Sequence, residues 1–150
     1  MIIVYSLKRD SKYIEEVQQA TLNTKNFGIE PTHGLFGSIE WWDNIKSGML
    51  PLQTIRGYIT RLYMGSMGDW PEFEMVDDTK IKSTWSRYAN GGDLGKFYAV
   101  GRRVELDFVI QNHRPGSSDG GAGTRVVLEV RIGAERSESL DIPKPTNTKV

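Results

Sequence analysis

The chain has 150 residues, with 19 Lys and Arg against 19 Asp and Glu, and it contains no cysteine. This length predicts a domain that buries a core without a disulfide or a structural metal. The balanced charge excludes a strong overall field toward nucleic acid or anionic membranes, and the missing cysteines exclude a thiol nucleophile. No apolar run approaches the roughly 20 residues that cross a bilayer. We therefore expect a soluble, cytoplasmic protein without a membrane partner.

The N-terminal part predicts a short strand followed by a helix. Residues 2–7 form a brief apolar run of the kind found in buried strands. Asp10 or Ser11 can cap a helix over residues 12–22, which carries an apolar stripe at helical spacing. An extended conformation for the end of this segment is the alternative.

A second, shorter helix is predicted over residues 39–47. Ser38 suits its N-cap, and Gly48 suits the position that ends it. Trp41 and Trp42 lie next to each other on this helix. We expect one ring to pack into the body of the protein, with the other either exposed or also in the core.

Five strand patterns follow the helices. They span residues 54–64, 70–76, 81–88, 102–112 and 124–132. The last two alternate apolar and polar residues and predict a long hairpin. In the first, both faces carry apolar residues, and Gly57 predicts a close backbone approach or a sharp bend.

These elements predict one α+β domain over residues 1–133 and a flexible polar tail over 134–150. The N-terminal helical segment would pack on a five-stranded antiparallel sheet that is strongly bent or closed into a small barrel. The strand spacing over residues 54–133 resembles that of OB-type and SH3-like barrels. This resemblance implies a fold and no function.

Aromatic and basic residues on or beside the predicted strands suggest a binding face. Residues 80–133 carry nine Lys and Arg against five Asp and Glu. Single-stranded nucleic acid needs this combination, because cations pair with phosphates and rings stack on bases. The main hypothesis is a non-catalytic binding module, with nucleic acid as its narrowest version, and the simpler alternative is that most of the rings are core. The candidate ligand-binding residues are Trp70, Phe73, Trp85, Arg87, Tyr88, Tyr98 and Arg102.

The first alternative is a protein–protein interaction module. Its contact surface would be either the helix that carries Trp41 and Trp42 or an acidic edge over residues 69–78, which could attract a basic partner or a second copy of the chain. The acidic residues of that edge are Asp69, Glu72, Glu74, Asp77 and Asp78.

The second alternative is a small hydrolase or lyase that uses His33 beside Glu40 or Asp43, since a carboxylate can orient an imidazole. We favour a protein without catalysis, because a single histidine is weak evidence for an active site. Two histidines and no cysteine give no metal-ligand spacing, so no metal and no cofactor are expected.

Overall fold

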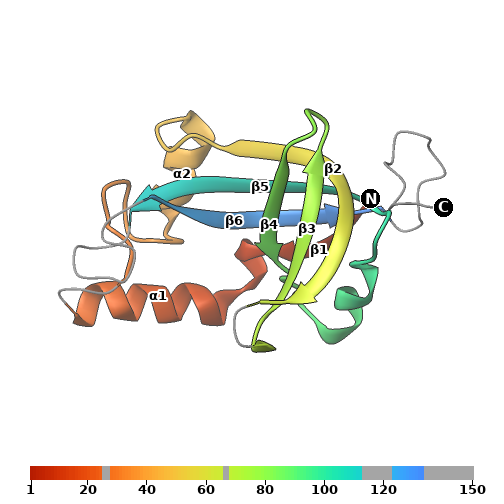
Figure 1. Ribbon diagram of the computed structural model, residues 1–150. Coiled ribbons are helices and arrows are strands. Elements are labelled where there is room, and N and C mark those ends of the chain that lie inside the picture. The colour runs from red at the N-terminus through yellow and green to blue at the C-terminus, as the bar shows by residue number, and fades with distance from the viewer. Residues whose placement is uncertain (25–27, 66–67, 113–122, 134–150) are drawn as a thin grey trace, which may run out of the picture. The chain divides into compact units, whose positions relative to one another are not determined.

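The computed structural model describes residues 1–24, 28–65, 68–112 and 123–133. Within them, six strands form one sheet in the order β1-β6-β5-β2-β3-β4 (Figure 1). The strands are β1 (Ile2–Ser6), β2 (Gln53–Met64), β3 (Pro71–Asp77), β4 (Lys82–Ser86), β5 (Arg103–Asn112) and β6 (Gly123–Ile132). The helices are α1 (Ser11–Asn23) and α2 (Ile39–Ser47), and the 3-10 turns are η1 (Leu7–Arg9) and η3 (Gly92–Phe97).

The predicted α+β class is confirmed, but the predicted strand count is one short. Residues 2–6 join the sheet beside β6, far from their neighbours in sequence. Such a long-range pairing leaves no local signal in the sequence. In the described residues, β1 and β4 are the two edge strands, so the sheet is open. The prediction of a closed barrel was therefore wrong. An OB-type or SH3-like topology stays a prediction.

The described residues gather into two compact units. Unit 1 takes its described residues from 1–5, 55–106 and 130–133, and unit 2 takes them from 6–54 and 107–129. Each unit has its own fully buried side chains, which include Phe73 and Leu106 in unit 1 and Phe36 and Trp41 in unit 2. The prediction of a single domain stays a prediction, and the predicted tail lies outside the described residues.

Unit 1 follows the alternation that the sequence predicts. In β3, Phe73 and Met75 are fully buried, whereas Glu72 and Glu74, which alternate with them along the strand, are half-buried. The register between β2 and β3 shifts once, between Ile59 and residue 61. This irregularity is a β-bulge, which bends a strand, and β2 is visibly curved (Figure 1).

Unit 2 contains the two helices, and both begin where the sequence predicts. The Asp10 side chain accepts a hydrogen bond from the Tyr13 backbone N–H at 3.3 Å. The Ser38 side chain accepts one from the Trp41 backbone N–H at 3.2 Å, and Gly48 ends α2 with a φ of 85°. None of the helices in the described part of the chain combines the length and hydropathy needed to cross a membrane.

The sequence predicts the wrong buried face for the end of β5. Alternation that starts from the buried Val104 and Leu106 would place Ile110 inward and Val109 outward, yet Ile110 is exposed and Val109 is fully buried. Trp41 of α2 explains the reversal, because its indole N–H donates to the Gln111 side chain at 2.8 Å. The helix therefore covers the odd-numbered positions at this end of the strand.

Replacing Gly57 with alanine should destabilise the protein. A Cβ there would meet the backbone of the paired strand, at the Val76 carbonyl oxygen and 2.7 Å from the Asp77 Cα, and backbone atoms cannot rotate away. We expect Gly57→Ala to lower the free energy of unfolding by about 1–3 kcal/mol in urea denaturation. Gly91→Ala is the control, since nothing lies within 4 Å of its Cβ. Equal stability of the two variants would contradict the close approach.

Candidate functional site

A hollow of about 450 Å³ lies beside α2, within unit 2. The helix contributes Trp42, Asp43, Ile45 and Lys46 to its wall. The remaining lining residues are Ser6, Lys8, Leu52, Asp107, Leu128 and Glu129, which come from β1, η1, the segment before β2, and strands β5 and β6. A concave, mixed polar and apolar surface of this size can receive a ligand or part of a partner.

Two tryptophans set the geometry of this wall. Trp41 is fully buried and its ring lies 4.8 Å from Phe36, so it anchors α2 to the rest of unit 2. Trp42 is half-buried and packs edge-on against Trp41, with 4.8 Å between ring centroids. The Lys8 ammonium lies over the Trp42 ring, 5.0 Å from its centroid. The anchored ring of Trp41 thus fixes Trp42 in the wall of the hollow.

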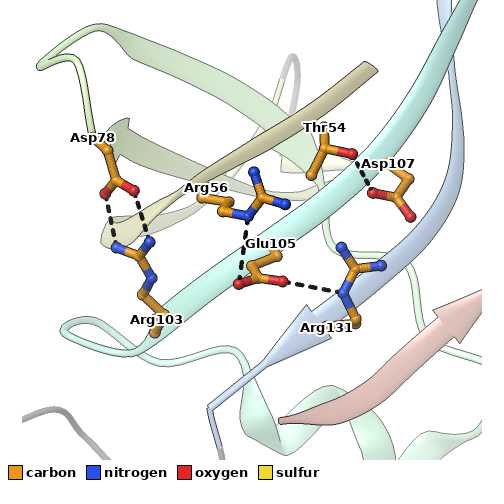
Figure 2. Close-up of polar contacts among 7 residues, drawn as sticks. All are labelled: Thr54, Arg56, Asp78, Arg103, Glu105, Asp107 and Arg131. Carbon is orange, nitrogen blue, oxygen red and sulfur yellow. Dashed lines mark hydrogen bonds and ion pairs between the residues drawn. The ribbon is translucent and has the colours of Figure 1, made fainter. Parts of the chain in front are cut away.

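The hollow carries three carboxylates, from Asp43, Asp107 and Glu129, against two ammonium groups. Asp107 and Glu129 are half-buried, and each lies between two buried residues of its strand. The Thr54 hydroxyl donates a hydrogen bond to Asp107 at 2.8 Å, which orients this carboxylate (Figure 2). The hollow therefore has a small excess of negative charge.

Exposed apolar side chains surround α2. Ile39, one turn before Trp42, is 82% exposed, and Met49, just after the helix, is 68% exposed. Leu52, which lines the hollow, is also exposed. Methionine and aromatic residues are enriched at protein–protein interfaces, and a gathering of exposed apolar residues marks such surfaces. We name Ile39, Trp42, Met49, Leu52 and the hollow the α2 surface.

A second polar cluster lies in unit 1, where its charges pair with one another (Figure 2). Arg103 makes two hydrogen bonds of 2.7 Å to the two carboxylate oxygens of Asp78. Glu105 lies between Arg131, at 3.3 Å, and Arg56, at 3.7 Å. The hydrogen bonds from Arg103 hold the pKa of Asp78 below its ordinary value.

The aromatic residues predicted to bind a ligand do not form an exposed row. Phe73, Trp85 and Tyr98 are buried in unit 1, and the rings of Phe73 and Tyr98 lie 5.3 Å apart. Burial raises the pKa of the Tyr98 hydroxyl far above its ordinary value. Tyr88 is half-buried and stacks on Tyr5, with 5.0 Å between centroids. These rings contribute to the core, as in the simpler alternative.

The other three predicted residues lie nearer the surface. Trp70 is 53% exposed, and its indole N–H donates to the Ser86 hydroxyl at 2.8 Å. Arg87 and Arg102 are half-buried and donate to backbone carbonyls, and the Nε of each is buried without a hydrogen-bond partner. A ligand-binding role for the seven residues stays a prediction.

The acidic residues over 69–78 do not form an edge. They belong to β3 and its flanks, and β3 lies between β2 and β4. Glu72 accepts a hydrogen bond from the Tyr63 hydroxyl at 2.9 Å, and Glu74 accepts one from the Thr60 hydroxyl at 3.0 Å. Asp77 closes the β3–β4 turn by accepting from the backbone N–H of Thr79. Contacts within unit 1 therefore engage the carboxylates of Glu72, Glu74 and Asp77.

His33 is half-buried, and its Nδ1 lies 2.9 Å from the Thr32 hydroxyl. Its backbone carbonyl accepts a hydrogen bond from the Asn44 side chain at 3.0 Å, so it helps to attach a loop to α2. Among the residues that the structure describes, no group of three or more His, Asp or Glu side chains could hold a metal ion.

Sequence reasoning identified the Trp41–Trp42 helix but missed the other lining residues of the hollow. Alternation places Asp107 and Glu129 on the outward faces of their strands, which was the one available signal. Their gathering with Lys8 and α2 depends on tertiary packing that no local pattern encodes.

The pairing of Asp78 with Arg103 predicts a pH-dependent part of the stability. Because the pKa of Asp78 is lower in the folded state, this contribution is complete above about pH 4 and is lost as the pH falls through the folded-state pKa. Asp78→Asn should lower the free energy of unfolding at pH 7 by at most about 1 kcal/mol, since the side chain is 53% exposed.

Urea denaturation at several pH values would measure this difference, which should shrink toward pH 2. Asp93→Asn, at an exposed carboxylate of η3, is the control and should change stability little. A difference between wild type and Asp78→Asn that does not depend on pH would contradict the assignment.

Comparison with known protein families gives a match to this chain. The family model for Immunity protein RhsI2 matches residues 1–133, which include every residue that the structure describes. A search of the curated proteins found no match. The family match contradicts the predicted nucleic-acid-binding module and supports the alternative, a role in protein–protein interaction. This chain belongs to the RhsI2 immunity protein family.

Proposed function

We propose that this protein protects against an Rhs toxin by binding it directly. The observation that carries this proposal is the family match over residues 1–133, because an immunity protein acts on a toxin. The match also supports the proposal that these residues make one domain. We further propose that the protein acts in the cytoplasm, which the cysteine-free sequence supports.

The α2 surface is the proposed contact region. It combines a half-buried tryptophan, exposed Ile39 and Met49, and a hollow. Trp42 rests on the buried Trp41, so little side-chain freedom would be lost on binding. Arg103, Asp78 and Glu105 of unit 1 already pair with one another, and a partner would have to replace those contacts. The exposed apolar side chains of the α2 surface favour it over the charged cluster.

The function is tested by expressing the toxin domain in bacteria with and without this chain. Protection of growth, together with a complex of the two purified proteins in isothermal titration calorimetry, is the expected result. Absence of both protection and a complex would overturn the proposal. If a chain whose α2 surface has been replaced still forms the complex and fully protects growth, the proposed function is kept. That outcome would show, however, that the α2 surface is not the contact region.

Trp42→Ala should weaken toxin binding by about 2 kcal/mol, or roughly thirtyfold in Kd, because central tryptophans often dominate interface energies. Trp70→Ala is the matched control: this ring is also partly exposed, but it lies in unit 1. We expect its Kd to stay within about threefold of wild type, since it lies outside the proposed contact region. Calorimetry measures both variants, and a larger loss for Trp70→Ala would place the interface elsewhere.

A further inference from the structure

We infer that, without toxin, α2 pairs in antiparallel orientation with α2 of a second copy of this chain. The contact is two-fold symmetric, so the same residues of both copies form it. It covers part of the α2 surface, and self-association therefore competes with the toxin. The pairing itself goes beyond the proposed function, whereas the competition rests on it.

Four exposed side chains follow one another along α2. Ile39 begins the helix and is 82% exposed, and Met49 follows its end and is 68% exposed. Asp43 and Lys46 lie between them and are also exposed. Steps of four and three residues place Ile39, Asp43 and Lys46 on one helical face. Because the buried Trp41 anchors the opposite face, this face points to solvent.

The order of these side chains is complementary to itself. It reads apolar, acidic, basic, apolar, and Lys46 lies in the last turn of the helix. Antiparallel pairing places Asp43 of each copy opposite Lys46 of the other, because the two-fold axis repeats every contact. The same alignment brings Ile39 of each copy beside Met49 of the other. Two ion pairs thus lie between two apolar contacts.

The charges select both the occupant and its direction. Parallel pairing would place Asp43 against Asp43 and Lys46 against Lys46, which repel each other. In the part of the chain that the structure describes, no ion pair joins Asp43 or Lys46 to another residue. Pairing between copies therefore breaks no existing ion pair of these two side chains, and it removes Ile39 and Met49 from water.

The size of the contact limits its strength. Stable complexes bury about 1,200–2,000 Å² in total, and one nine-residue helix from each copy falls below that range. The pairing is therefore weak and reversible, as in transient complexes. A toxin that contacts Ile39 and Met49 more tightly displaces the second copy. Self-association then shields these apolar side chains only while no toxin is bound.

The first test measures self-association by sedimentation equilibrium at low salt, at concentrations up to about 1 mM. Asp43→Lys and Lys46→Asp each place like charges opposite each other twice, so each should weaken self-association about tenfold. An equal mixture of the two variants should associate about as tightly as wild type, because both opposing pairs are attractive again. Asp93→Lys, at an exposed acid of unit 1, is the control and should match wild type.

A wild-type chain that stays monomeric at about 1 mM would overturn the inference. Variants that associate like wild type, or that do not associate with each other when mixed, would also overturn it. Circular dichroism shows whether each variant keeps its helices. Ile39→Ser provides a variant without a charge change, and it should weaken self-association about fivefold, since this exposed side chain supports no core.

The second test adds the toxin domain to the concentrated wild-type chain. The expected product contains one copy of this chain for each toxin domain. A complex in which two copies stay joined through α2 would overturn the competition but not the pairing. No complex at all would overturn the proposed function and the competition with it, while the sedimentation results, which need no toxin, still decide the pairing.

Discussion

The burial of Trp41 is the constraint on which the α2 surface depends. A helix of nine residues is too short to be stable alone, so tertiary contacts must hold it. Trp41 supplies them through its buried ring and through the hydrogen bond to Gln111. The same contact covers one face of β5 and orients Trp42 beside the hollow. One side chain thus connects the packing of unit 2 to its exposed surface.

Features set by nearby residues could be predicted from the sequence. Ser38 and Gly48 bound α2 because capping depends on a few adjacent positions. The inward side chains of β3 follow from a period of two. Gly57 indicated a close backbone approach, and the Val76–Asp77 backbone does lie beside it. Each of these inferences needed only a short segment of the chain.

Features set by distant residues could not be predicted. An aromatic ring has the same sequence signature in a core and on a binding face, and the structure buries Phe73, Trp85 and Tyr98. Strand Ile2–Ser6 finds its partner at the other end of the chain. The charge surplus over residues 80–133 suggested nucleic acid, but the family match points to a protein partner instead.

The contact between Asp78 and Arg103 has a mechanical consequence for unit 1. Asp78 follows β3 and Arg103 begins β5, and β2 lies between these two strands in the sheet. The side-chain pair therefore connects the end of β3 to the start of β5 across β2. The Asp78 backbone N–H also donates a hydrogen bond to the Arg56 carbonyl of β2. The pair therefore links three strands at one end of the sheet, and because it contributes at most about 1 kcal/mol, it adds modestly to the strand pairing there.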